Sequence, residues 1–190
     1  MVRHYVPEGL PQEVLERIVS TVRRAPSAGF SQGQRLLVVT ERRLLDELAA
    51  RERADRQSGV EPWFESAPAH VLVLTREQDY HDRYRREDKL QGGEEIEWPV
   101  PYWFVDAGAA LMLVLLAAID EGLAAGVYGV PVEQEPGWRE LLRIPDDLRI
   151  VAGVTLGRAA PDPGWSKATS RATQRRRTLD ELVRWNTWSS

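Results

Sequence analysis

Cysteine is absent from this sequence of 190 residues. The absence excludes disulfides, thiolate-bound metals and cysteine nucleophiles. The three histidines, His4, His70 and His81, show no metal-ligand spacing, so we do not expect a metal site. The chain also lacks the G-x-S-x-G pattern of a nucleophile elbow, which leaves a serine hydrolase without support.

A strong excess of charge and a long hydrophobic run are missing as well. The chain carries 25 basic and 29 acidic residues, a net charge of −4, which does not favour nucleic acid or a membrane as the main partner. The longest apolar run, 107–119, is shorter than the about 20 residues that cross a bilayer. The first residues, MVRHYVPEG, show no signal-peptide pattern. We expect a cytoplasmic protein with a single domain over 1–190.

The apolar residues that are present alternate between helical and strand patterns. The order of these segments shows no regular βαβ repeat, so the fold class predicted is α+β. The helices are expected at 11–24, 41–57, 106–121, 136–142 and 178–185, and the strands at 36–40, 71–74 and 150–156.

The segment AGAALMLVLLAAI is apolar on all sides of its expected helix, for which Asp106 can serve as the cap. A helix of this kind is buried on every side, which predicts a long central helix at a subunit interface. Before it, residues 75–104 form a charged, then aromatic, excursion that is a candidate lid. Tyr102 and Trp103 in this excursion are candidates for the wall of a substrate pocket, and a place in a dimer core is the alternative.

Three polar turns are candidates for ligand contacts. The turn at 26–35 offers the hydroxyl of Ser27, the amide of Gln32 and the cation of Arg35, and a polar loop that binds no ligand is the alternative. The segment GLAAGVYGVP lacks the spacing of a dinucleotide fingerprint, and a helix C-cap is its alternative interpretation. The segment RATQRRRT suits phosphate, and a solvated basic face is the alternative.

The order of these segments resembles the nitroreductase family of flavin enzymes. The family typically reads A-P-S-x-x-N-x-Q-P-W, and here RRAPSAGFSQ stands in its place. The segments that follow in order are DAGAALMLVLLAAIDEGLAAGVYG, LLRIPDDLRIVAGVTLGRAAPD and RRRTLDELVRWNTW. The similarity runs from about residue 3 to residue 188, and it is weak between 51 and 101.

The resemblance implies an α+β homodimer with a mixed or antiparallel central sheet flanked by helices, and with two FMN molecules at the dimer interface. It implies that NADH or NADPH reduces FMN, which then reduces a small acceptor such as a nitroaromatic or a quinone. The flavin carries this chemistry, so no catalytic side chain is expected.

Carried over position by position, the resemblance gives a set of cofactor-binding residues. Arg3 would hold the phosphate or the ribityl chain, and the arginines at 175–177 would neutralise the phosphate. The turn at 127–129 would offer a backbone N–H toward flavin N5. The complete set is Arg3, Ser27, Gln32, Arg35, Val127, Tyr128, Gly129, Arg175, Arg176 and Arg177.

Several positions depart from the family pattern. Phe30 stands where the family has an asparagine, and becomes a candidate pocket residue beside Tyr102 and Trp103. Gly33-Gln34 replaces Pro-Trp, and the R-R-S start of the family is missing. Three outcomes stay open. FMN is held by other contacts, or the deazaflavin F420 takes its place, or the protein is a non-catalytic dimer. Such a dimer would bind a flavin or F420, or would have an empty pocket.

Overall fold

The structure is a computed structural model that describes residues 2, 4–54, 64–161 and 175–188. The described chain divides into two compact units, 1–160 and 161–190, each of which is treated by itself. Among its described residues, the first unit contains a sheet and five α-helices, of which α3 is the shortest. The second contains α6 (Leu179–Leu182), which is shorter than the helix expected at 178–185. The prediction of a single domain stays a prediction.

The sheet has four strands in the order β1-β2-β4-β3, and every neighbouring pair is antiparallel. The bounds are Gln34–Val39 for β1, Ala69–Thr75 for β2, Ala124–Tyr128 for β3 and Arg149–Gly157 for β4. All seven residues of β2 are buried. The α+β class and the antiparallel alternative for the sheet are therefore confirmed. The helix C-cap interpretation of GLAAGVYGVP is incomplete, because strand β3 lies inside that segment.

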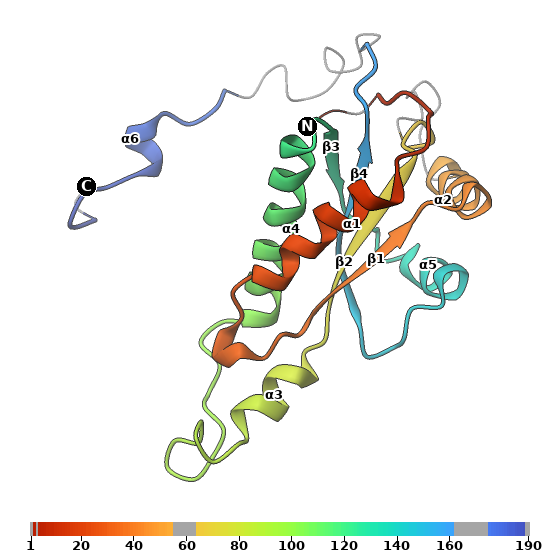
Figure 1. The fold of residues 1–190 in the computed structure, drawn as a ribbon. Helices are drawn as coiled ribbons and strands as arrows, with labels where there is room; N and C mark the ends of the chain where they lie inside the picture. Colours follow the sequence, from red (N-terminus) through yellow and green to blue (C-terminus); the bar gives the residue numbers. More distant parts are fainter. Residues whose placement is uncertain (1, 3, 55–63, 162–174, 189–190) are drawn as a thin grey trace. The chain divides into compact units, whose positions relative to one another are not determined.

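Helices cover both faces of the sheet (Figure 1). Helix α1 (Gln12–Ser20) and helix α4 (Tyr102–Asp120) pack on one face, and α2 (Arg42–Ala54) and α5 (Glu135–Leu142) pack on the other. Alternate residues of β2 supply the two cores: Val71 packs with α1 and α4, and Leu72 packs with α2 and α5. This is the period of two expected when a strand is buried on both faces.

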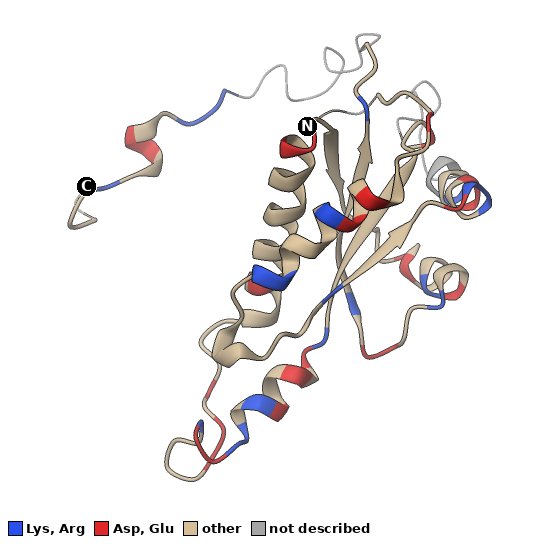
Figure 2. Ribbon diagram, viewed as in Figure 1, with Lys and Arg blue, Asp and Glu red and all other residues tan. Residues whose placement is uncertain are grey.

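Helix α4 buries only one of its faces within the chain. The buried residues recur every three or four positions, at Trp103, Asp106, Ala107, Ala110, Val114 and Ala118. The opposite face exposes apolar side chains by 41–67%, namely Phe104, Val105, Met112, Leu116 and Ile119. Figure 2 shows this helix without basic residues along its length. The expectation of burial on every side therefore fails for the single chain, and an interface on the second face stays a prediction.

Helix α4 also corrects the estimate of apolar length. Residues 102–105 extend the run 107–119 into a helix of 19 residues, which is long and apolar enough to cross a membrane by length and composition alone. A core helix of a soluble protein passes the same test, and 33% of the apolar window is buried in the chain. The short apolar run in the sequence argued against a membrane span, and the length of α4 removes that argument. The cytoplasmic location stays a prediction.

Candidate functional site

The turn before β1 has an unusual backbone. Gly29, Phe30 and Gln32 all have positive φ, at 59°, 61° and 53°. Positive φ is uncommon outside glycine, and a strained residue costs about 1–3 kcal/mol. Such a conformation persists only where the surrounding structure holds it in place.

Hydrogen bonds inside the turn supply part of this support. The Gln32 N–H donates to Ser27 Oγ at 3.0 Å, and the Ser31 hydroxyl donates to the Ala28 carbonyl at 2.6 Å. Arg35 donates from one guanidinium nitrogen to the Gln32 carbonyl at 2.6 Å. Ser27 and Arg35, which the sequence offered to a cofactor, therefore also stabilise the turn itself.

Contacts from α3 (Gln78–Tyr84) and α4 supply the rest. The carboxylate of Asp106 accepts from the Ala28 N–H and from the Tyr80 hydroxyl, both at 2.8 Å. Arg83 donates to the Gly29 carbonyl at 2.9 Å. Burial, followed by the hydrogen bond to Asp106, raises the pKa of Tyr80, so its hydroxyl stays a donor.

Asp106 is the residue whose role the sequence interpretation missed. Helix α4 begins at Tyr102, so Asp106 is not its cap, and its side chain is 6% exposed. A carboxylate inside an otherwise apolar helix was the available signal, because a buried charge needs hydrogen-bond partners. Those partners lie 26 and 78 positions away along the chain, and sequence spacing could not reveal them.

Two cavities meet at Phe30, whose side chain is 74% exposed. One has a volume of about 350 Å³ and apolar walls from Val19, Val22 and Leu36. The other has a volume of about 600 Å³ and is lined by Phe30, Ser31, Gln32, Arg35, Asp79, Asp82, Arg83 and Arg86; we call it the arginine cavity. Phe30, Gln32 and Arg35 line both cavities, so the fold brings three of the predicted residues together.

The predicted turn at 127–129 lies at the end of β3. The Tyr128 ring faces into the core, where its hydroxyl is 3.0 Å from His70 Nδ1, and it leaves no room for a side chain at Gly153. The backbone of Gly129 is open, because a Cβ built there would meet no atom within 4 Å. The main chain of this turn, rather than the tyrosine ring, can therefore face a ligand.

His70 holds the Tyr128 ring in place through a hydrogen bond to its hydroxyl. Its Nε2 lies 3.3 Å from the Phe64 carbonyl, which can only accept, so Nε2 carries the proton and Nδ1 accepts from the Tyr128 hydroxyl. Burial lowers the pKa of His70 to about 3, with a smaller contribution from the charge of Arg42. The imidazole is thus neutral at physiological pH.

The two predicted turns lie at the same end of the sheet but on opposite edges. Gln34 of β1 pairs with Thr75 of β2, which pairs with Arg149 at the start of β4, whereas Tyr128 ends β3 on the far side. Three strand spacings separate the edges by about 14 Å. Within one chain the fold does not bring the two turns together.

The aromatic excursion folds into a cluster of its own. Trp98 lies 4.5 Å from Tyr84 and 5.8 Å from Trp103 between ring centroids. Its indole N–H donates to Glu95, whose pKa is lowered despite desolvation because Trp98, His81 and Arg85 all stabilise the carboxylate. Trp103 is 8% exposed in this cluster, and the adjacent Tyr102 is half-buried. Their role as pocket walls stays a prediction.

The basic segment belongs to the second unit. Arg175 forms two hydrogen bonds with the carboxylate of Glu181, at 2.6 and 2.7 Å, and this pairing lowers the pKa of Glu181 to about 2. Arg176 and Arg177 are exposed. Arg3, the remaining predicted phosphate ligand, lies outside the described residues.

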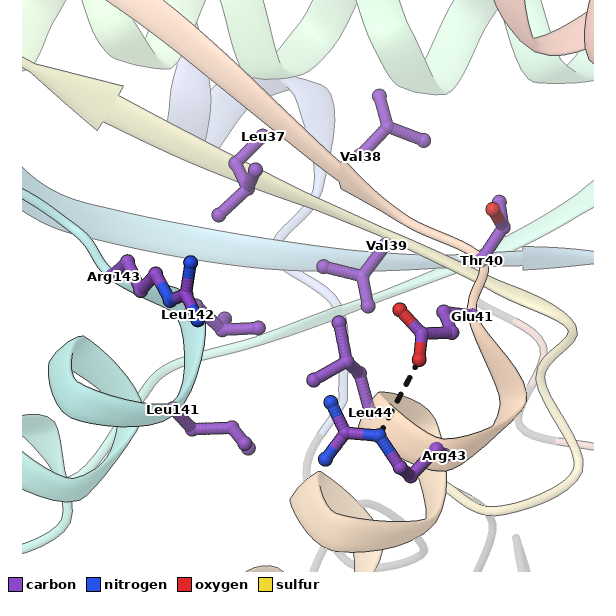
Figure 3. Close-up of a pocket in the computed structure, with 10 residues that line it drawn as sticks. All are labelled: Leu37, Val38, Val39, Thr40, Glu41, Arg43, Leu44, Leu141, Leu142 and Arg143. Carbon is purple, nitrogen blue, oxygen red and sulfur yellow. Dashed lines mark ion pairs between the residues drawn. The ribbon is translucent and has the colours of Figure 1, made fainter.

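A further cavity of about 450 Å³ opens beside β1 (Figure 3). Leu37, Leu44, Leu141 and Leu142 line it, with Arg43 paired to Glu41 at its rim. Among the described residues, none of those expected to bind cofactor or substrate lines it.

The sequence model of the Nitroreductase family matches residues 1–158, and the chain belongs to this family. Among curated proteins, it is 28% identical over 166 residues to the FMN reductase [NAD(P)H] of Bacillus subtilis. That alignment covers 84% of this chain and 62% of the relative, so the chain spans less than two thirds of that protein's length.

Solved structures show the same fold. B. megaterium NfrA1 superimposes with a TM-score of 0.71 at 20% identity, covering 99% of this chain and 71% of that one. An FMN-dependent nitroreductase of Clostridium difficile gives a TM-score of 0.68 at 18% identity, covering 98% and 94%. The resemblance found from the ordered segments is thereby confirmed, and so is the fold that it implied.

Proposed function

We propose that this protein is an FMN-dependent oxidoreductase that takes a hydride from NADH or NADPH and delivers it to a small acceptor such as a nitroaromatic or a quinone. The observation that carries the proposal is membership of the Nitroreductase family over residues 1–158. Similarity to the FMN reductase [NAD(P)H] of B. subtilis supports both the flavin and the nicotinamide donor.

The residues present fit such a cofactor. FMN supplies the hydride-transfer chemistry when it is bound, and the protein has to orient a flat ring and an anionic tail. The open backbone at Gly129 can approach the edge of a ring, and the apolar cavity walls of Val19, Val22 and Leu36 suit its face. Within the second unit, taken by itself, Arg176 and Arg177 are exposed cations of the type that pairs with phosphate.

The visible spectrum of the purified protein tests the proposal. A bound flavin gives absorbance in the visible range, and anaerobic NADH or NADPH should bleach it within the turnover time of a working enzyme. A protein that neither copurifies with nor binds FMN, FAD or F420 would overturn the assignment.

We propose further that the protein works as a homodimer through the exposed face of α4. Five apolar side chains gather on this face, and a contiguous patch of this kind typically marks an interface. The resemblance implies a cofactor at the interface of two chains, and a second copy can supply the turn that lies about 14 Å away within one chain.

A charged substitution on this face tests the dimer. Leu116→Glu puts a carboxylate in the centre of the patch and should give a monomer in light scattering coupled to size exclusion. Val132→Glu is the control, because Val132 is 78% exposed and lies on the turn before α5. The same mass for the wild type and for Leu116→Glu would refute this interface.

Phe30 favours a second candidate, a dimer that binds a flavin or F420 without catalysis. The family pattern offers an amide at this position, and an aromatic ring cannot form the corresponding hydrogen bond. A bound flavin that NADH, NADPH and reduced F420 all fail to bleach would support this alternative. Rapid bleaching by any of the three would exclude it.

A further inference from the structure

The arginine cavity holds one cation that lacks a partner within the described part of the chain. Arg35 pairs with Asp79 at 2.8 Å, and Arg83 pairs with Asp88 at 2.7 Å. Arg86 is exposed, and its guanidinium forms no ion pair or hydrogen bond among the described residues. Its charge is therefore available to a ligand.

The carboxylates of the cavity are already engaged. Asp79 also accepts from Arg76 at 2.8 Å, and Asp82 accepts from the amide of Gln78 at 2.6 Å. Three arginines and two aspartates line the cavity, which gives it a formal charge of +1. A net charge of one favours a monoanion, and one guanidinium fork matches a carboxylate.

Phe30 provides the second, independent observation. Its ring is 74% exposed, although its backbone has φ of 61° and is held there by the contacts of Asp106 and Arg83 with its neighbours. Backbone strain of this kind clusters at active sites and ligand clamps, where the surrounding structure holds it in place. The ring borders both the apolar cavity and the arginine cavity.

We infer that this site binds an aromatic carboxylate, whose ring lies against Phe30 and whose carboxylate pairs with Arg86. The inference rests on the proposed function, for which it names the substrate class: an aromatic acceptor that carries a carboxylate. Arg86 acts here in binding and specificity, since hydride transfer needs no charged side chain at this position. Recognition of this kind affects ground-state and transition-state binding equally.

Titration calorimetry with 4-nitrobenzoate and with neutral nitrobenzene tests the site in the protein as purified. The wild type should bind the carboxylate about tenfold more tightly. Arg86→Gln should remove that preference, since a charge-assisted hydrogen bond is lost. Arg85→Gln is the matched control: it removes the neighbouring charge, which pairs with Glu95 at 2.8 Å and does not line the cavity.

Phe30→Leu should weaken both ligands by a similar factor, because it removes the ring and leaves Arg86 in place. In steady-state assays, Arg86→Gln should raise KM for 4-nitrobenzoate about tenfold and leave kcat unchanged. Equal affinity of the wild type for the two ligands, no saturable binding, or an equal loss in Arg85→Gln would overturn the inference.

The outcomes separate this inference from the proposed function. If a bound flavin is bleached by NADH or NADPH while the carboxylate shows no advantage, the inference fails and the oxidoreductase stands. If no flavin binds, the oxidoreductase fails, and calorimetry still decides whether Arg86 and Phe30 form a carboxylate site.

Discussion

Acid should destabilise this protein through His70 in a way that a single substitution can isolate. The imidazole is 1% exposed, and burial lowers its pKa to about 3 from the ordinary 6.5. Between these two values the unfolded state binds a proton that the folded state does not. The contribution of His70 is therefore complete above pH 6.5 and is lost as the pH falls toward 3.

The size of the effect follows from linkage. At pH 4.5, which is two units below the unfolded pKa, the folded state should lose roughly 3 kcal/mol relative to neutral pH. At pH 5.5 the loss should be roughly half as large. These are large fractions of the about 5–15 kcal/mol by which a typical domain is stable.

Urea unfolding of the wild type and of His70→Gln at pH 7.5, 5.5 and 4.5 measures this contribution. Glutamine can donate to the Phe64 carbonyl and accept from Tyr128 as His70 does, but it does not titrate. Other acidic groups titrate in both proteins, so the difference in unfolding free energy between wild type and His70→Gln should change by roughly 3 kcal/mol between pH 7.5 and pH 4.5, in favour of the variant. A gap that stays constant with pH would refute the reasoning, as would a protonated His70 in nitrogen NMR at pH 5.

Other consequences of the packing can be measured by the same unfolding assay. Gly153→Ala should cost about 1–3 kcal/mol, because its Cβ would lie 1.9 Å from Tyr128 Cζ. Gly108→Ala should instead be neutral or stabilising by up to about 1 kcal/mol, since an added Cβ in this helix meets no atom within 4 Å, and an equal loss in both variants would contradict the steric argument. Asp106→Ala leaves two donors without their acceptor and should cost about 2–4 kcal/mol, whereas Asp106→Asn keeps an oxygen and should cost less. Hydrogen exchange at the Ala28 amide should quicken in Asp106→Ala; unchanged protection would mean that this hydrogen bond does not hold the turn.

Some elements could be predicted because their signal is local. Helix α1 shows its apolar spacing directly, and it leads into a short 3₁₀ turn, Thr21–Arg24. The turn ends there because Ala25, the residue before Pro26, is restricted to extended backbone. Strand β2 is a continuous apolar run, as expected for burial on both faces.

Strand β3 was missed for a physical reason. Its residues, AAGVY, have little strand propensity, and small residues after a helix suggest a turn. They form a strand because β4 offers a partner from Gly153 to Gly157, including Gly153 beneath the Tyr128 ring. The low strand propensity of these residues matters less than their pairing with β4, which exists only in the folded chain.

The sequence by itself determined the α+β class, the family and the positions of the polar turns, because periodicity and ordered segments are properties of neighbouring residues. Only the tertiary structure showed that Asp106 holds the Phe30 turn, that Arg86 has no ion-pair partner among the described residues, and that the two predicted flavin turns lie on opposite edges of the sheet. Each of these depends on distance in space between residues far apart in the chain. Hydrogen bonds and ion pairs form between residues that are close in space, and spacing along the sequence does not show which residues these are.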